Sequence, residues 1–428
     1  GVWLLVFLLP ISITTVFPHE IMGLTGLNPY SLIFLVTLLS FMLHTAWRGE
    51  LVAYLGFPSI WWAYLLPITV AALIGMNHVK EIPDFMLTTQ AVTFTNASGY
   101  LRDAYIKPVT YLMVTFLVGA ALRDHMRSEW LITALALSLL AFAGWILFYI
   151  VYLQLGLDIL SSSTSRAALT GTGIQANGIG SMAAIGLLLC IFMLAENPGG
   201  PIKVLLWITA AAAGLLVVLS FSRGGMLTFL VGFTWFLFKQ RKLNVLFIAV
   251  LIGVATIPFL PDSVYERMSV GLDDSADTIA TDSNDALTAG RVAGVWLPQR
   301  PDFLANPLIG KGLNSTLWSD ALRDGSITIQ SANPHNLYLK ILLNTGILGL
   351  LLFGVFYRDI WRRFTSLASA EAQPPIVRGL AKGARAGLLG YLAYGASNGD
   401  FMPTPILFFL LISIGFLIGT DAKPHNKP

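Results

Sequence analysis

Long runs of apolar residues, separated by short polar stretches, dominate the sequence. A membrane-spanning helix needs about 20 predominantly apolar residues, within a range of roughly 17–25. Twelve stretches reach or approach this length: 1–17, 30–46, 57–76, 108–122, 130–154, 176–195, 203–220, 225–238, 243–260, 336–357, 384–398 and 404–419. The pattern therefore predicts an all-α polytopic membrane protein with about 12 transmembrane helices.

Basic residues are distributed unevenly over the loops between these stretches. Lysine and arginine are about threefold denser in one set of loops than in the opposite set. The dense set comprises 47–56, 123–129, 196–203, 239–242, 358–385 and the tail 420–428. Because cytoplasmic loops are enriched in lysine and arginine, we expect the large segment 261–335, which belongs to the sparse set, to lie outside. We interpret residues 1–428 as one integral membrane domain, with this segment inserted between spans 9 and 10.

The composition agrees with this interpretation and excludes other classes of protein. Of 428 residues, 55% are hydrophobic and 11% are charged, whereas soluble domains carry about 25% charged residues. The formal net charge of +3 is small and scattered, so nucleic acid is not an expected partner. A single cysteine, Cys190, excludes disulfides and cysteine metal clusters. The chain also lacks a phosphate-binding loop, a dinucleotide fingerprint and an HExxH helix.

Candidate chemistry begins where the large segment enters the tenth span. Asn333 is a good N-cap and Pro334 suits the first helical position, which places His335 in the first turn at the outer end. The positive end of a helix disfavours imidazolium, so we expect a mostly neutral His335 that can accept a proton. The alternative interpretation is a capping or interfacial histidine.

Two glycines follow on the same face of this expected helix. With about 100° per residue, Gly346 lies within about 20° of His335, and Gly349 lies about 40° to the other side. Small residues on such a stripe allow a neighbouring helix to approach closely. Lys340 points about 140° away from His335, and we expect its side chain to extend outward to the interface.

Three arginines fall on the side that the topology depletes of positive charge: Arg166, Arg223 and Arg291. An arginine near a helix end often extends its side chain to lipid headgroups. Guanidinium groups also bind phosphate oxygens bidentately and stay charged at any relevant pH. We therefore expect an outward-facing anionic lipid headgroup as the ligand. Asp400 lies in a very short outer turn, where it pairs with one of these arginines, orients His335 or faces water; the sequence leaves the three open.

Four motifs occur in a characteristic order along the chain. They are a Ser-Phe-Ser-Arg-Gly-Gly turn, an arginine with a tryptophan five residues later, a glycine-containing stretch, and a His-Asn pair followed after nine residues by Gly-x-x-Gly: Ser220–Gly225, Arg291 with Trp296, Asn306–Asn314 and His335–Gly349. This combination resembles the O-antigen ligase and polymerase superfamily, which also includes oligosaccharyltransferases that glycosylate pilin. The resemblance covers about residues 166–350 and the twelve-span layout.

The resemblance implies transfer of a glycan from undecaprenyl diphosphate on the periplasmic side of a Gram-negative inner membrane. It implies that His335 is the general base and that Arg291 and Arg223 bind the diphosphate as it leaves. Arg166, Asn336 and Asp400 are the implied substrate-binding residues: Arg166 for the same headgroup, Asp400 as a weaker correspondence. Three arginines can replace a divalent metal ion, so we expect metal independence and no cofactor.

Within the superfamily, the layout favours the ligase that joins O-antigen to lipid A–core. The chain has one large outer segment and no extended C-terminal domain, whereas polymerases often have two sizeable outer loops and protein glycosyltransferases often a longer C-terminal portion. An O-antigen polymerase and a protein oligosaccharyltransferase remain the alternatives within the family. A lipid or polysaccharide transporter or flippase is the alternative of another class, although such proteins generally place ionisable groups or broken helices at mid-membrane.

Overall fold

The computed structural model describes residues 1–18, 20–21, 24–25, 28–48, 60–88, 92, 94–123, 126–156, 159–160, 168–239, 241, 291–327, 333–404 and 407–420. The expected span 243–260, residues 261–290 and Arg166 lie outside this part of the chain.

The described elements are helices apart from one small hairpin. The longer helices and short α-helical turns are α1 (Val2–Ser12), α2 (Pro29–Trp47), α4 (Trp61–His78), α5 (Asp84–Thr88), α6 (Ala97–Tyr100), α7 (Lys107–Arg123), α8 (Ser128–Tyr152), α11 (Ala176–Ala195), α12 (Gly200–Leu219), α13 (Arg223–Lys239), α16 (Arg300–Ala305), α17 (Asp320–Arg323), α18 (Leu337–Ser369), α19 (Pro375–Tyr394) and α20 (Phe408–Thr420). The 3₁₀ turns are η1 (Val79–Glu81) and η6 (Ser315–Trp318), and the π-helical turns are η2 (Leu101–Ile106) and η5 (Val292–Trp296). Strands β1 (Glu20–Ile21) and β2 (Leu24–Thr25) pair antiparallel.

A helix coincides with every predicted apolar stretch except 243–260, which is not among the described residues. Within the described part of the chain, seven helical segments are long and apolar enough to cross a membrane: Pro29–Trp47, Trp61–Glu81, Ala97–Arg123, Ser128–Tyr152, Ala176–Ala195, Gly200–Leu219 and Leu337–Ser369. The structure is therefore that of an all-α membrane protein, as predicted. The total of twelve spans stays a prediction.

The predicted inner loop 358–385 is wrong, because most of it is helical. α18 continues to Ser369 and α19 begins at Pro375, so that only residues 370–374 connect them. Buried side chains recur at helical spacing beyond the apolar run: Phe356, Ile360, Phe364 and Leu367. This stripe keeps α18 helical where charged residues interrupt the continuous hydrophobicity.

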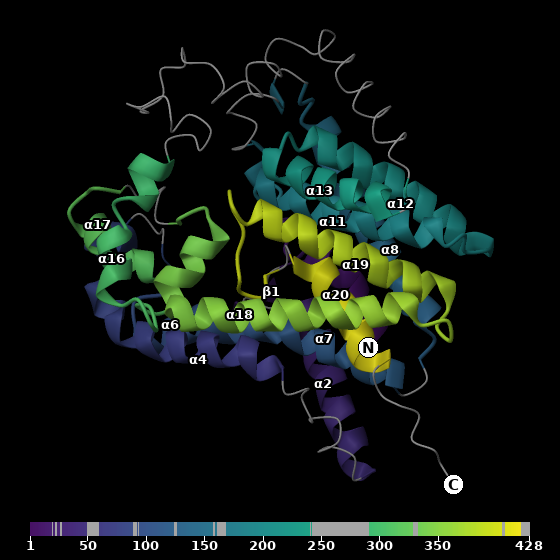
Figure 1. The fold of residues 1–428 in the computed structure, drawn as a ribbon, viewed down its shortest axis with the longest axis horizontal. Coiled ribbons are helices and arrows are strands. Elements are labelled where there is room, and N and C mark those ends of the chain that lie inside the picture. Colours follow the sequence, from purple (N-terminus) through teal and green to yellow (C-terminus); the bar gives the residue numbers. More distant parts are fainter. Residues whose placement is uncertain are drawn as a thin grey trace.

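Helices α11 and α19 form the centre of the bundle (Figure 1). α19 packs against α11, α13 and α18. Two of its glycines face α11 closely: a Cβ at Gly379 would lie 2.7 Å from Cα of Met193, and one at Gly383 would lie 2.7 Å from Cα of Leu189. The two helices therefore approach to backbone contact, which small residues permit in membranes.

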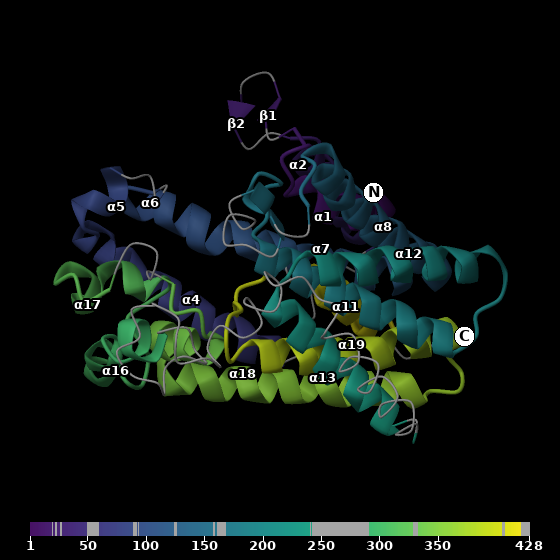
Figure 2. The same cartoon turned by 90° about the horizontal axis from the view of Figure 1, so that it is seen from above.

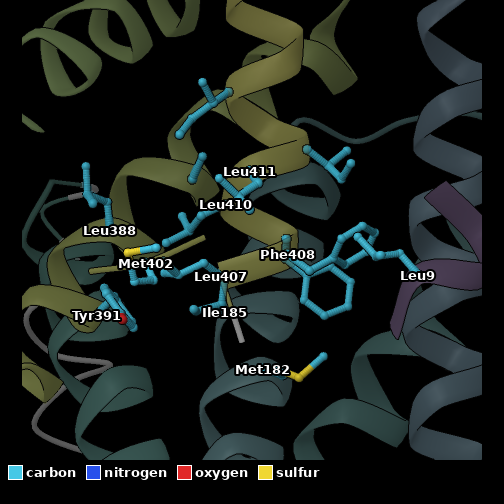
Figure 3. Close-up of a cluster of buried hydrophobic side chains, with 14 of the residues drawn as sticks. Leu9, Met182, Ile185, Leu388, Tyr391, Met402, Leu407, Phe408, Leu410 and Leu411 are labelled. Atoms are coloured by element: carbon cyan, nitrogen blue, oxygen red, sulfur yellow. The ribbon is translucent and has the colours of Figure 1, made fainter. Parts of the chain in front are cut away.

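A continuous apolar core fills the space between these helices, α1 and α20. The first turns of α20 lie between Leu388 of α19 and Ile185 of α11, and Phe408 extends toward Leu9 of α1 (Figure 3). Met402 joins the same core from the connection between α19 and α20. The core therefore fixes this connection as well as the helices.

One arginine joins three helices near the end of the bundle where residues 370–374 connect α18 to α19. The guanidinium carbon of Arg385 in α19 lies 4.9 Å from the ring centroid of Trp235 in α13 and 4.7 Å from that of Trp361 in α18. Both distances fall within the range of cation–π attraction.

Ion pairs join segments of the chain at two ends of the bundle. At one end α16 packs against α18, and α17 lies at the same end of the bundle (Figures 1 and 2); Arg323 of α17 pairs there with Glu81 after α4 at 3.3 Å. At the other end, Glu196 after α11 pairs with Arg378 at 3.4 Å and with Lys382, both in α19. Which end faces the periplasm stays a prediction.

Helix α18 is broken at Gly346, where φ is 67° and ψ is −170°. In an unbroken helix the N–H groups of residues 347–348 would bond to the carbonyls of residues 343–344. Here these N–H groups donate to the carbonyls of residues 307–308 at 2.8 and 3.1 Å. The carbonyls of 343–344 accept from the N–H groups of residues 311–312 at 2.9 and 3.1 Å. Residues 307–312 therefore supply partners for four of the backbone groups that the break releases.

This break corrects the role predicted for the Gly-x-x-Gly pair. The neighbour that approaches Gly346 is the loop at residues 307–309 rather than another helix, and a Cβ there would lie 2.2 Å from the carbonyl of Leu308. A Cβ at Gly349 would meet the side chain of Thr345 within α18 at 2.0 Å and Cβ of Pro67 in the neighbouring helix α4 at 3.5 Å. Asn344 adds a side-chain link, since its Oδ1 accepts from the backbone N of Ser315 at 3.1 Å and from its Oγ at 2.8 Å.

The replacement Gly346→Ala should destabilise the protein by at least about 2 kcal/mol, because a left-handed residue with a Cβ costs about 1–2 kcal/mol before the collision with Leu308 is counted. The matched control is Gly354→Ala on the same helix, where a Cβ would meet nothing within 4 Å. The control should be neutral or slightly stabilising. Thermal unfolding of the purified variants in detergent measures both, and equal midpoints would contradict the role of the break.

The sidedness of the bundle can be tested with single cysteines, since the native Cys190 is buried. A cysteine replacing the exposed Ser326, after α17, should react with an impermeant thiol reagent in intact spheroplasts. A cysteine replacing the exposed Ser366, near the end of α18, should react only after lysis. The reverse pattern would invert the predicted topology.

Candidate functional site

The residues after α19, here named the post-α19 segment (residues 395–400), connect the candidate site residues to one another. The carbonyl oxygens of residues 395–397 accept, in order, from the backbone N of Leu337 at 2.7 Å, from Nδ2 of Asn336 at 3.1 Å and from Nη1 of Arg291 at 2.6 Å. Three neighbouring carbonyls therefore connect the start of α18 to the stretch that begins at Arg291.

The start of α18 differs from the prediction by three residues. Asn336 is the N-cap, and its Oδ1 accepts from the backbone N of Tyr338 and of Leu339, both at 3.0 Å. Asn333 instead accepts from the backbone N of His335 at 3.2 Å. His335 therefore lies outside the helix, immediately before its cap, with a left-handed φ of 50°. Because the cap satisfies two helix N–H groups, it fixes the backbone next to His335.

Arg291 and its companion tryptophan lie against this helix start. Arg291 precedes the π-helical turn η5, and Trp296 at the end of that turn donates from Nε1 to the carbonyl of Pro334 at 2.8 Å. Hydrogen bonds therefore hold both the guanidinium of Arg291 and Pro334, the residue directly before His335. The spacing of Arg291 and Trp296 has a structural reason, because one residue reaches Ser397 while the other reaches Pro334.

Arg223 is the first residue of α13, and its side chain is exposed. The preceding turn is tight, with Phe221 at φ 45°, and Oγ of Ser222 accepts from the backbone N of Gly225 at 3.0 Å. Gly224 packs on the ring of Tyr394, since a Cβ at this position would lie 2.2 Å from a ring carbon. This contact places Arg223 next to the end of α19.

Tyr394, the last residue of α19, connects the two arginine-bearing elements. Its side chain is buried, and the charges of Arg291 and Asp400 both act on it. The sequence does not point to Tyr394, because an aromatic side chain at a helix end carries no specific signal. The structure therefore brings Arg223, Arg291, His335 and Asp400 together around one helix end, whereas Arg166 lies outside the described residues.

Asp400 pairs with Lys340, which corrects the prediction for both residues. Nζ of Lys340 lies 2.6 Å from Oδ2 of Asp400, and 15% and 25% of the two side chains are exposed. Lys340 therefore points into the site rather than outward to the interface. The sequence held a signal for this pair, because a lysine inside an apolar span usually needs an acidic partner.

Within the described part of the chain, no group of three or more His, Cys, Asp or Glu side chains is arranged to bind a metal ion. The cations of the site are the side chains Arg223, Arg291 and Lys340.

Residues 208–354 match the family model described as O-antigen ligase. Over this segment the chain is similar to that family. The match confirms the resemblance found in the sequence, and it includes Arg223, Arg291 and His335. Members of the family are glycosyltransferase-type membrane enzymes, ligases and polymerases, with lipid-linked glycans as substrates. A search of curated proteins found no match.

Proposed function

We propose that this chain transfers O-antigen glycan from undecaprenyl diphosphate to a hydroxyl of lipid A–core, on the periplasmic side of a bacterial inner membrane. The observation that supports this most is the post-α19 segment, which bonds to Arg291 and to Asn336 beside His335. A proton acceptor and a phosphate-binding cation at one end of an apolar bundle suit a donor with a lipid tail and a charged headgroup.

In the proposed reaction the acceptor hydroxyl oxygen attacks the anomeric carbon of the donor glycan. His335 accepts the hydroxyl proton as this bond forms. The bond between the anomeric carbon and the diphosphate oxygen breaks, and undecaprenyl diphosphate leaves with the electron pair. General-base catalysis typically contributes about 10²–10⁴-fold, and stabilisation of the leaving charge adds more.

The arginines in this proposal bind the diphosphate. A guanidinium carries five N–H donors in one plane, so Arg291 can donate to the carbonyl of Ser397 and still present other N–H groups to phosphate oxygens. Arg223 begins a helix of 17 residues, whose positive end attracts the same anion. Arg166 is proposed to bind the same headgroup. We propose that these cations act without a divalent metal ion or other cofactor.

Asn336 and Asp400 have indirect roles in this proposal. The side-chain amide of Asn336 is used in capping α18 and in the bond to Ala396. The carboxylate of Asp400 accepts from Lys340 and from the backbone N of Met402. Both residues therefore shape the substrate-binding site through the groups that they position.

Purified protein in detergent, supplied with lipid-linked glycan and lipid A–core, tests the proposed class directly. An enzyme forms product without a sealed compartment, whereas a flippase or transporter does not. Replacing lipid A–core with a second lipid-linked glycan tests for a polymerase, and a pilin acceptor tests for a protein oligosaccharyltransferase. Product with lipid A–core alone supports the ligase. Added chelator should leave the rate unchanged; strict dependence on a divalent ion would contradict the metal-free proposal.

Arg291→Lys should reduce transfer by about 100-fold, because lysine keeps the charge but loses the planar, bidentate geometry. The matched control is Arg300→Lys, an exposed arginine nine residues further along the same outer segment. The control should transfer at the normal rate. Arg223→Lys should behave like Arg291→Lys. Normal transfer by both variants would leave these arginines as anchors at the interface.

His335→Ala should abolish transfer while the protein still inserts and binds the lipid-linked donor. The rate of the unchanged protein should rise with pH as the imidazole loses its proton and then level off, because only neutral imidazole accepts a proton. Loss of donor binding in the variant would make His335 a substrate ligand instead. Full activity would remove the general base from the mechanism.

A further inference from the structure

We infer that Lys340 is a positioning residue: its ion pair with Asp400 holds the post-α19 segment against the first turn of α18 and so aligns Arg291 and His335. The inference rests on the proposed function, because its effect is measured in the transfer reaction. Lys340 belongs to no motif that the resemblance uses.

The Lys340–Asp400 ion pair anchors the C-terminal end of the post-α19 segment to α18. The segment leaves α19 with the N–H groups of Ser397 and Asn398 donating to the carbonyl of Tyr394 at 2.9 and 3.0 Å. It then turns at Gly399, whose φ is 105°. Asp400, directly after this turn, reaches Lys340. The carbonyl of Ser397, which orients Arg291, therefore lies between two fixed points.

Asp400 is itself held firmly on the α19 side. Its backbone N donates to Oη of Tyr391 at 2.8 Å, and Oη of Tyr391 donates to its backbone carbonyl. Its Oδ1 accepts from the backbone N of Met402 at 3.1 Å. The carboxylate is thus presented to α18 from a rigid support, and Lys340 is the residue of α18 that receives it.

Lys340 lies one turn after the cap of α18, since its backbone N donates to the carbonyl of Asn336 at 2.9 Å. Asn336 also donates from its side chain to Ala396. The Asn336–Ala396 and Lys340–Asp400 contacts both join α18 to the post-α19 segment, one near each end of that segment. Loss of the distal contact allows the start of α18 to pivot about the proximal one, which moves His335 relative to Arg291 on the rigid segment.

A role in stability alone predicts something different. Replacement of both partners of a partly buried ion pair by neutral side chains is often tolerated, because desolvation offsets most of their attraction, whereas a single replacement leaves the other charge unpaired. We therefore expect the double variant to fold like the unchanged protein, with its loss confined to catalysis. Because Arg291 is proposed to stabilise the departing charge, kcat for the donor should fall more than KM rises.

The test compares Lys340→Met, Asp400→Asn and the double variant in detergent with lipid-linked glycan and lipid A–core. Each single variant should lose about 10-fold or more in kcat/KM for the donor, with the KM for the acceptor unchanged. The kcat/KM of the double variant should be no lower than that of the less active single variant, because both changes remove the same contact. Lys340→Arg should retain most of the transfer activity of the unchanged protein. The control pair is Lys107→Met with Asp103→Asn, an ion pair of 2.7 Å at the start of α7.

Three outcomes would overturn the inference. Losses that multiply in the double variant, or an unaffected Asp400→Asn, would make Lys340 a direct substrate ligand. Lower thermal unfolding midpoints with normal kcat/KM per folded molecule would make the pair structural only. Normal activity in all variants would remove the pair from the site. Absence of transfer by the unchanged protein would instead count against the proposed function, so the two failures are distinguishable.

Discussion

The break in α18 at Gly346 is the constraint on which the arrangement of the site depends. Backbone N–H and C=O groups released in apolar surroundings need partners, and irregular backbone at membrane depth occurs only where protein covers it. Residues 307–312 supply those partners through four backbone hydrogen bonds. The loop at residues 307–312 is therefore joined to helix α18 by its main chain. That junction places Trp296 against Pro334 and Arg291 against Ser397, which are parts of the chain far apart in sequence.

The centre of the bundle fixes the other half of the site. The glycines of α19 bring it to backbone contact with α11, and Gly224 at the start of α13 lies against Tyr394. The end of α19 is therefore determined by close packing on several sides. The post-α19 segment inherits this position, which explains how a stretch of six residues can orient groups from α18 and from the outer segment.

The sequence predicted the helices well, because continuous apolar runs leave few alternatives to a membrane span. It failed where tertiary contacts decide. Both Asn333 and Asn336 can cap a helix, and the choice falls to Asn336, whose amide also finds the carbonyl of Ala396. Gly346 reads as a packing residue unless the loop that covers it is known. The sequence predicted individual site residues. It did not predict that they converge on the post-α19 segment, since no local pattern identifies backbone carbonyls as the connecting groups.

The distribution of charge gives the site its chemical character. Cations at the end of an apolar bundle raise the local positive potential, which favours an anionic headgroup whose tail remains in lipid. A carboxylate among them would weaken that potential unless its charge were already matched. Lys340 matches Asp400 at 2.6 Å, so the acid can hold the post-α19 segment without opposing Arg291. The Lys340–Asp400 pair therefore has two effects: it anchors the post-α19 segment, and it preserves the positive potential at the arginines.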